Sequence, residues 1–78
     1  MTSEQLRAVR EANPFKPFTI HLVDGRSWQV PHRDYLSISP TGRTAVAYQA
    51  NAWSIIDIML ITELAFEERA APTGNDGS

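Results

Sequence analysis

The side chains with the clearest potential for chemistry lie around Pro31. His32 and Asp34 are two positions apart, and His21 precedes them in the chain. Imidazole and carboxylate groups suit zinc or a similar divalent ion, and the chain has no cysteine that could add a thiolate. Three such residues form no recognised metal motif. We therefore expect a solvated polar turn here, with no metal and no cofactor.

The same region contains the residue types of a hydrolase. Ser37, His32 and Asp34 could act as nucleophile, base and orienting acid. No nucleophile elbow surrounds the serine. A chain of 78 residues also has little room for the pocket of about 300 Å³ or more that substrates need. The sequence therefore predicts a protein that is not an enzyme and that has no small-molecule substrate.

Arginine and aromatic side chains suggest a second chemistry, the binding of RNA or single-stranded DNA by stacking and phosphate contacts. The formal net charge is −2, and the acidic excess lies in residues 63–78, which hold four acidic residues and one arginine. Strong nucleic-acid binders usually present a basic face. We keep nucleic-acid binding as the alternative function, with Trp28 assigned to the core. Its candidate residues are Arg26, Tyr35, Arg43 and Tyr48.

The most unusual pattern is in residues 52–60, which predict a strand that is apolar on both faces. Ser54, Ile56, Ile58 and Leu60 alternate with Trp53, Ile55, Asp57 and Met59. Antiparallel strands with one solvated face are usually polar on that face, and an uncovered apolar strand promotes aggregation. Either the N-terminal helix or another chain should cover the second face.

From this pattern we expect a protein-interaction module that forms a homo-oligomer or binds a protein partner. The predicted contact residues are Trp53, Ile55 and Met59, with Asp57 as a specificity element. Nothing in the sequence identifies the partner or the number of copies.

Several short elements must position these residues. Thr2 and Gln5 have the spacing of a capping box, which predicts a helix that ends near Asn13, before Pro14. Asp24-Gly25 predicts a hairpin in residues 18–30. A three-residue loop, 23–25, pairs Ile20 with Trp28 and keeps the large apolar groups on one face; a loop of residues 24–26 satisfies the same parity and is the second choice.

The rest of the chain predicts further short strands. Residues 35–38 and 44–48 flank the turn Ser39-Pro40-Thr41-Gly42, where Pro and Gly occupy favoured positions. After residues 52–60 the alternation slips, which predicts a single turn in residues 60–63 before a last strand. The fold class is mainly β, of the α+β type. We expect a short N-terminal helix and four or five antiparallel strands, in an SH3-like or Sm-like small barrel or in a meander.

Residues 14–64 resemble a group of short uncharacterised bacterial proteins. The shared features are PF-x-PF-x-I-x-L-x-DGR, VPH, SP-x-GR and IID. This resemblance implies no activity. The order of helix, hairpin and late apolar strand is also similar, more faintly, to Sm-like RNA-binding proteins, which implies a small barrel. Where those proteins hold a basic pair for RNA, this chain has Ser54-Ile55-Ile56-Asp57.

Composition and length set the remaining expectations. Residues 1–69 should form one domain, and the Pro- and Gly-containing residues 70–78 should be a disordered tail. No segment has the polarity pattern of a signal peptide or the length of a membrane span. We therefore expect a bacterial, cytoplasmic protein.

Overall fold

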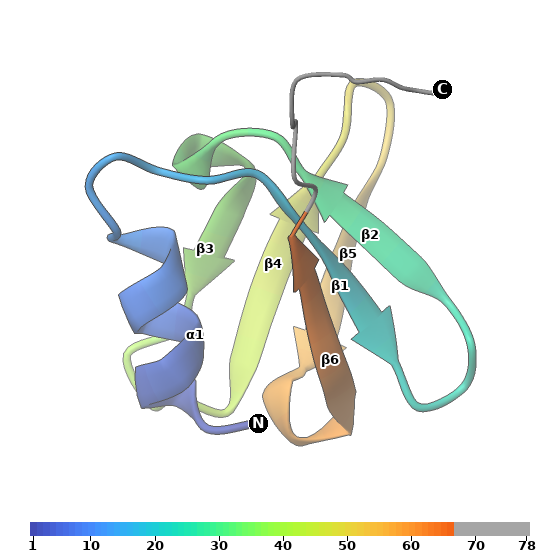
Figure 1. The fold of residues 1–78 in the computed structure, drawn as a ribbon. Coiled ribbons are helices and arrows are strands. Elements are labelled where there is room, and N and C mark those ends of the chain that lie inside the picture. The colour runs from blue at the N-terminus through green and yellow to red at the C-terminus, as the bar shows by residue number, and fades with distance from the viewer. Residues whose placement is uncertain (67–78) are drawn as a thin grey trace, which may run out of the picture.

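A computed structural model describes residues 1–66 of the chain. It contains one short helix and six strands in two antiparallel three-stranded sheets, ordered β2-β1-β6 and β3-β4-β5 (Figure 1). The predicted mainly β fold with an N-terminal helix is confirmed. The sheets are not closed into a barrel, and there are six strands rather than four or five. The predicted tail, residues 70–78, lies outside the described residues.

The helix α1 (Ser3–Arg10) begins with the predicted capping box. The Thr2 hydroxyl accepts a hydrogen bond from the Gln5 backbone N–H, and the Gln5 side chain accepts one from the Thr2 N–H. Two otherwise unpaired donors are thereby satisfied. The helix ends at Arg10, earlier than the predicted end near Asn13. The helix lies beside β3 (Figure 1), and its buried residue, Leu6, belongs to the core.

The first sheet is built on the hairpin of β1 (Phe18–Leu22) and β2 (Ser27–Val30). Phe18 pairs with Val30 and Ile20 with Trp28, which confirms the three-residue loop 23–25. Gly25 has a φ of 94°, a left-handed conformation that glycine adopts without steric cost. The strand β6 (Ile61–Phe66) pairs with the other side of β1.

The second sheet follows a short 3₁₀ helix, η1 (Arg33–Tyr35), that interrupts the strand after Pro31. It consists of β3 (Leu36–Ile38), β4 (Thr44–Tyr48) and β5 (Trp53–Asp57). The predicted turn between β3 and β4 is confirmed, because the Gly42 N–H donates to the Ser39 carbonyl over 3.0 Å.

The predicted strand 52–60 is wrong at its end. It stops at Asp57, and the 3₁₀ helix η2 (Ile58–Leu60) begins two residues earlier than the predicted turn. The Asp57 carboxylate accepts a hydrogen bond from the Met59 backbone N–H, which favours this tight turn. Leu60, predicted to face inward, is therefore 48% exposed, and Ile61 takes the buried position instead.

The core lies between the inner faces of the two sheets. It is entirely apolar among the described residues, since no polar or charged residue there is buried. The fully buried members come from the helix, both sheets and η2. They include Leu6, Ile20, Val30, Leu36 and Ile58.

Candidate interaction surface

The second face of β5 is open to solvent. Trp53 is 65% exposed and Ile55 62%, and Met59 in the adjoining η2 is 82% exposed. Asp57 is exposed on the same side of the strand. The four residues that the sequence analysis selected are therefore together on the surface, at and just beyond one edge strand.

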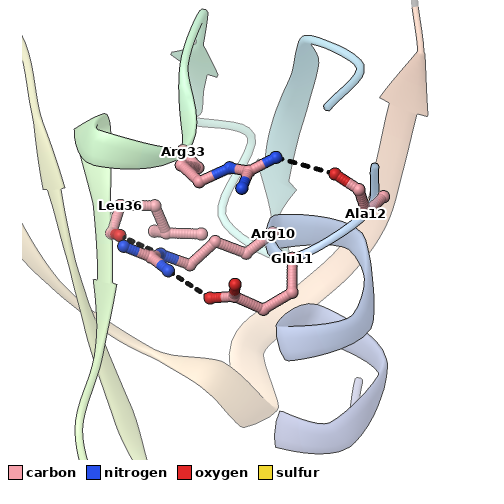
Figure 2. A network of polar contacts seen from close by, with 5 residues as sticks. All are labelled: Arg10, Glu11, Ala12, Arg33 and Leu36. Atoms are coloured by element: carbon pink, nitrogen blue, oxygen red, sulfur yellow. Dashed lines mark hydrogen bonds and ion pairs between the residues drawn. The ribbon is translucent and has the colours of Figure 1, made fainter. Parts of the chain in front are cut away.

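The N-terminal helix does not cover this face, which removes one of the two covers considered from the sequence. Instead α1 lies at β3, the opposite edge of the same sheet (Figure 1). Two arginines hold it there, as Figure 2 shows. Arg10 Nε donates to the Leu36 carbonyl over 2.5 Å, and an Arg33 Nη donates to the Ala12 carbonyl over 2.8 Å.

The apolar surface continues from β5 onto β4. Tyr48 lies opposite Trp53, and Val46 lies opposite Ile55 in the antiparallel register. Directly opposed residues project from the same face of a sheet, and Tyr48 is exposed while Val46 is half-buried. We call this surface the outer patch. It consists of Val46, Tyr48, Trp53, Ile55 and Met59.

The backbone of β5 adds hydrogen-bonding groups to the outer patch. Gln49 donates to the Ala52 carbonyl and Ile58 to the Arg43 carbonyl, which fixes the alternation of the β4–β5 ladder. In that alternation Ser54 and Ile56 bond to β4, while the N–H and C=O groups of Trp53, Ile55 and Asp57 point away from it. In the described part of the chain, β5 has a strand neighbour on one side only.

A pocket lies at the end of β5, between that strand and the loop of the first hairpin. Its volume is about 240 Å³, below the usual size of a small-molecule site. The backbone N–H of Val23 donates to the Leu60 carbonyl over 2.9 Å, which ties the hairpin loop to η2 beside it. We call it the end pocket. It is lined by Leu22, Val23, Asp24, Arg26, Ile55, Ile56, Asp57 and Leu60.

The charged groups of the end pocket are partly paired. Asp24 accepts hydrogen bonds from the Arg26 backbone N–H over 3.0 Å and from Arg26 Nε over 2.8 Å. The backbone N–H, followed by the guanidinium, lowers the pKa of the Asp24 carboxyl. Asp57, whose carboxylate accepts from the Met59 N–H, gives the pocket a net negative charge alongside its apolar wall.

The four nucleic-acid candidates do not form one surface. Arg26 directly follows the loop of the first hairpin and is paired with Asp24. Arg43 precedes β4 and Tyr48 ends it, so about 16 Å of strand separates them. Tyr35 in η1 is near the Tyr48 end of the sheet, since Leu36 pairs with Ala47. Trp28, assigned to the core, is half-buried and packs against it.

The histidines and their carboxylate neighbour are also dispersed. His21 pairs with Ser27 near the loop end of the first hairpin, whereas His32 follows its open end and begins η1. His32 packs against Tyr35 with a ring separation of 6.0 Å. Asp34 lies within η1 and Ser37 on the exposed side of β3. Within residues 1–66 no group of three potential metal ligands is assembled.

Two features of the structure could not be predicted from the sequence: the end pocket and the arginines that hold the helix at β3. The end pocket needs Val23 and Leu60, which come from distant turns and have no shared motif. The arginines that fasten the helix donate to backbone carbonyls, and carbonyls carry no sequence signal. In contrast, once the pairing of β5 with β4 is known, the alternation of residues 53–57 shows which of them direct their backbone groups to the open edge.

The sequence matches no family model, no curated protein and no solved structure at a significant level. The helix of the described region is too short to cross a membrane.

Proposed function

We propose that this protein is a non-enzymatic interaction module that self-associates through the outer patch. The main observation is that, among residues 1–66, Trp53 and Ile55 combine exposed apolar side chains with backbone groups that point away from β4 and find no strand there. Apolar area supplies binding free energy, and a strand edge supplies directional hydrogen bonds. Trp53, Ile55 and Met59 provide the contact, and Asp57 restricts which groups can lie opposite it.

The surface favours a polypeptide partner over a small molecule or a nucleic acid. The end pocket is small and lies beside an open strand edge, which suits a side chain carried on an extended backbone. The outer patch contains no basic residue, and the end pocket has one arginine that is already paired with Asp24. Phosphate contacts would therefore have to come from arginines that lie apart.

Sedimentation velocity over a wide range of protein concentrations tests the proposal. We expect the wild type to self-associate, and Trp53→Ala and Met59→Ser to weaken the association at least about tenfold each, because each removes an exposed contact side chain. Phe66→Ala is the matched control, since Phe66 is a partly exposed aromatic residue of the other sheet. It should leave the association constant unchanged.

The contrary outcomes are distinct. A wild type that stays monomeric at every concentration contradicts self-association. If that monomer instead shifts single-stranded oligonucleotides in a gel, and the shift weakens steeply with salt, the alternative function is supported, because phosphate binding releases counterions. Under that alternative, substitutions of Arg26 and Arg43 should reduce the shift.

A further inference from the structure

We infer that β5 of one chain pairs antiparallel with β5 of a second copy, about a two-fold axis at Ile55, and that each Trp53 enters the end pocket of the other copy. This inference rests on the proposed self-association and specifies its geometry. It is carried by the backbone of β5, by the position of the end pocket, and by the symmetry that relates the two.

The backbone of β5 sets the register of the proposed pair. Hydrogen-bonded pairs in an antiparallel ladder form between residues whose N–H and C=O groups face each other. In β5 these residues are Trp53, Ile55 and Asp57. With Ile55 on the axis, Trp53 lies opposite Asp57 of the second copy and Ile55 lies opposite itself. Every other antiparallel register leaves part of β5 unpaired, so this one makes the most hydrogen bonds.

This register brings Trp53 of one copy beside the end pocket of the other. Opposed residues project from the same face, so Trp53 lies beside Asp57 of the second copy, and Asp57 lines the end pocket. The lining also includes apolar residues, among them Ile55 and Leu60. An indole ring fits this environment, because its N–H can donate to the carboxylate while its ring covers apolar surface.

Charge favours the same arrangement. Arg26 lines the end pocket, and a guanidinium near an indole face gains a cation–π interaction. The two Asp57 carboxylates lie at opposite ends of the paired strands, about 13 Å apart along the strand direction. Registers centred nearer the end of β5 would instead bring these like charges together, which destabilises a strand pair.

Symmetry identifies the occupant as a second copy of this chain. The projecting residue, Trp53, and the receiving pocket lie at the two ends of one five-residue strand. In a two-fold interface every contact between two different residues occurs twice, once from each copy to the other. The same rotation therefore inserts both indoles at once, whereas an unrelated strand would need its own large apolar residue at the matching position.

Cysteine cross-linking tests the register directly, because the chain has no native cysteine. In the proposed pair the two Ile55 Cα atoms are about 5.5 Å apart, within the range of a disulfide. Ile55→Cys should therefore form a covalent dimer under mild oxidation. Ser37→Cys is the control, because Ser37 is exposed on β3 at the far edge of the same sheet; it should remain uncross-linked.

A mixture of Ile55→Cys and Glu63→Cys chains tests a head-to-tail alternative. Glu63 is an exposed residue of β6, an edge strand of the other sheet. A prominent 55–63 cross-link would overturn the two-fold arrangement. The proposed geometry predicts that the covalent product contains Ile55→Cys chains only.

Fluorescence of Trp53 tests the pocket without relying on a cysteine variant. In a Trp28→Phe background, Trp53 is the only tryptophan, and its emission should move to shorter wavelength as concentration rises. Leu60→Lys, which places a charge in the end pocket, should abolish this shift and weaken association at least about 30-fold.

The outcomes separate this inference from the proposed function. Self-association with neither a 55–55 cross-link nor an emission shift overturns the geometry and leaves the proposed function standing. A cross-link with unchanged Trp53 emission overturns insertion into the pocket. A chain that is monomeric at all concentrations overturns both.

Discussion

Gly25 and Gly42 both have a left-handed backbone, with φ values of 94° and 75°, but their surroundings differ. A Cβ on Gly25 would meet nothing within 4 Å, whereas one on Gly42 would lie 2.7 Å from Ser3 Oγ. The first site therefore tests backbone conformation alone. The second tests conformation together with the packing of the helix N-terminus against the β3–β4 turn.

We predict that Gly25→Ala lowers the free energy of unfolding by about 1 kcal/mol, the cost of a left-handed alanine. Gly42→Ala should cost roughly 1–3 kcal/mol more, because the new methyl group must also displace Ser3. Urea denaturation of the two variants measures both values. Equal losses would contradict the close approach of Ser3 to Gly42.

At the scale of single residues, the sequence predicted the structure where two independent constraints gave the same answer. Gly25 follows Asp24 in a turn motif, and the parity of Ile20 and Trp28 independently required a three-residue loop. The exposure of Trp53 could not be predicted, because its apolar character suits a core and an interface equally well. Only the position of α1, which lies at β3 and leaves β5 uncovered, distinguishes a core position of Trp53 from an exposed one.

At the scale of elements, the helix is held to the second sheet by Arg10 and Arg33 as well as by Leu6. The Arg33 guanidinium spans from η1 to the Ala12 carbonyl and lies 5.7 Å from the centre of the Phe15 ring. Arg10 also forms an ion pair with Glu11. These contacts orient the connector that leads from α1 to β1.

We predict that Arg33→Ala lowers the free energy of unfolding by about 1.5–3 kcal/mol, since it removes a hydrogen bond from a charged, partly buried donor. Arg33→Lys should recover only part of the loss, because lysine keeps the charge but lacks the planar group that lies near Phe15. Denaturant titration provides the measurement. Arg7→Ala, at an exposed position of the same helix, is the control and should change stability little.

Element boundaries were predictable where a side chain caps or breaks the backbone. Thr2 and Gln5 identified the start of α1, whereas the end of β5 was placed too late. The reason is that apolar alternation persists through Ile58 and Leu60, although Asp57 has already turned the chain into η2. A carboxylate that accepts a hydrogen bond two residues ahead was the available signal.

At the scale of the whole molecule, the small apolar core limits the stability of a single chain. A domain of this length buries only about 60% of its unfolded surface, and the outer patch adds nothing to the core of an isolated copy. Pairing would bury part of that patch and couple folding to association. The separation into two sheets was not predicted, because Pro31 indicates a break in the strand but not that β2 and β3, on either side of the break, lie in different sheets.

We predict a midpoint of thermal unfolding that rises by a few degrees for each tenfold increase in protein concentration, because association stabilises the folded state by mass action. Calorimetry or circular dichroism at several concentrations measures this. In the Trp53→Ala variant, which associates at least about tenfold more weakly, the rise should require correspondingly higher concentrations. A wild-type midpoint that does not move with concentration would contradict coupling between folding and pairing.

The bond from Arg10 to Leu36 has a consequence for growth of the sheet. Leu36 directs its backbone groups away from β4; its carbonyl accepts from Arg10 and its N–H donates to the Arg33 carbonyl. At Leu36 the outer edge of β3 is thus already occupied, and α1 lies beside this edge, which favours the addition of strands at the β5 edge. Joining two β5 edges would give a six-stranded sheet with α1 beside β3 at each end, an arrangement that favours a pair of chains over a fibril.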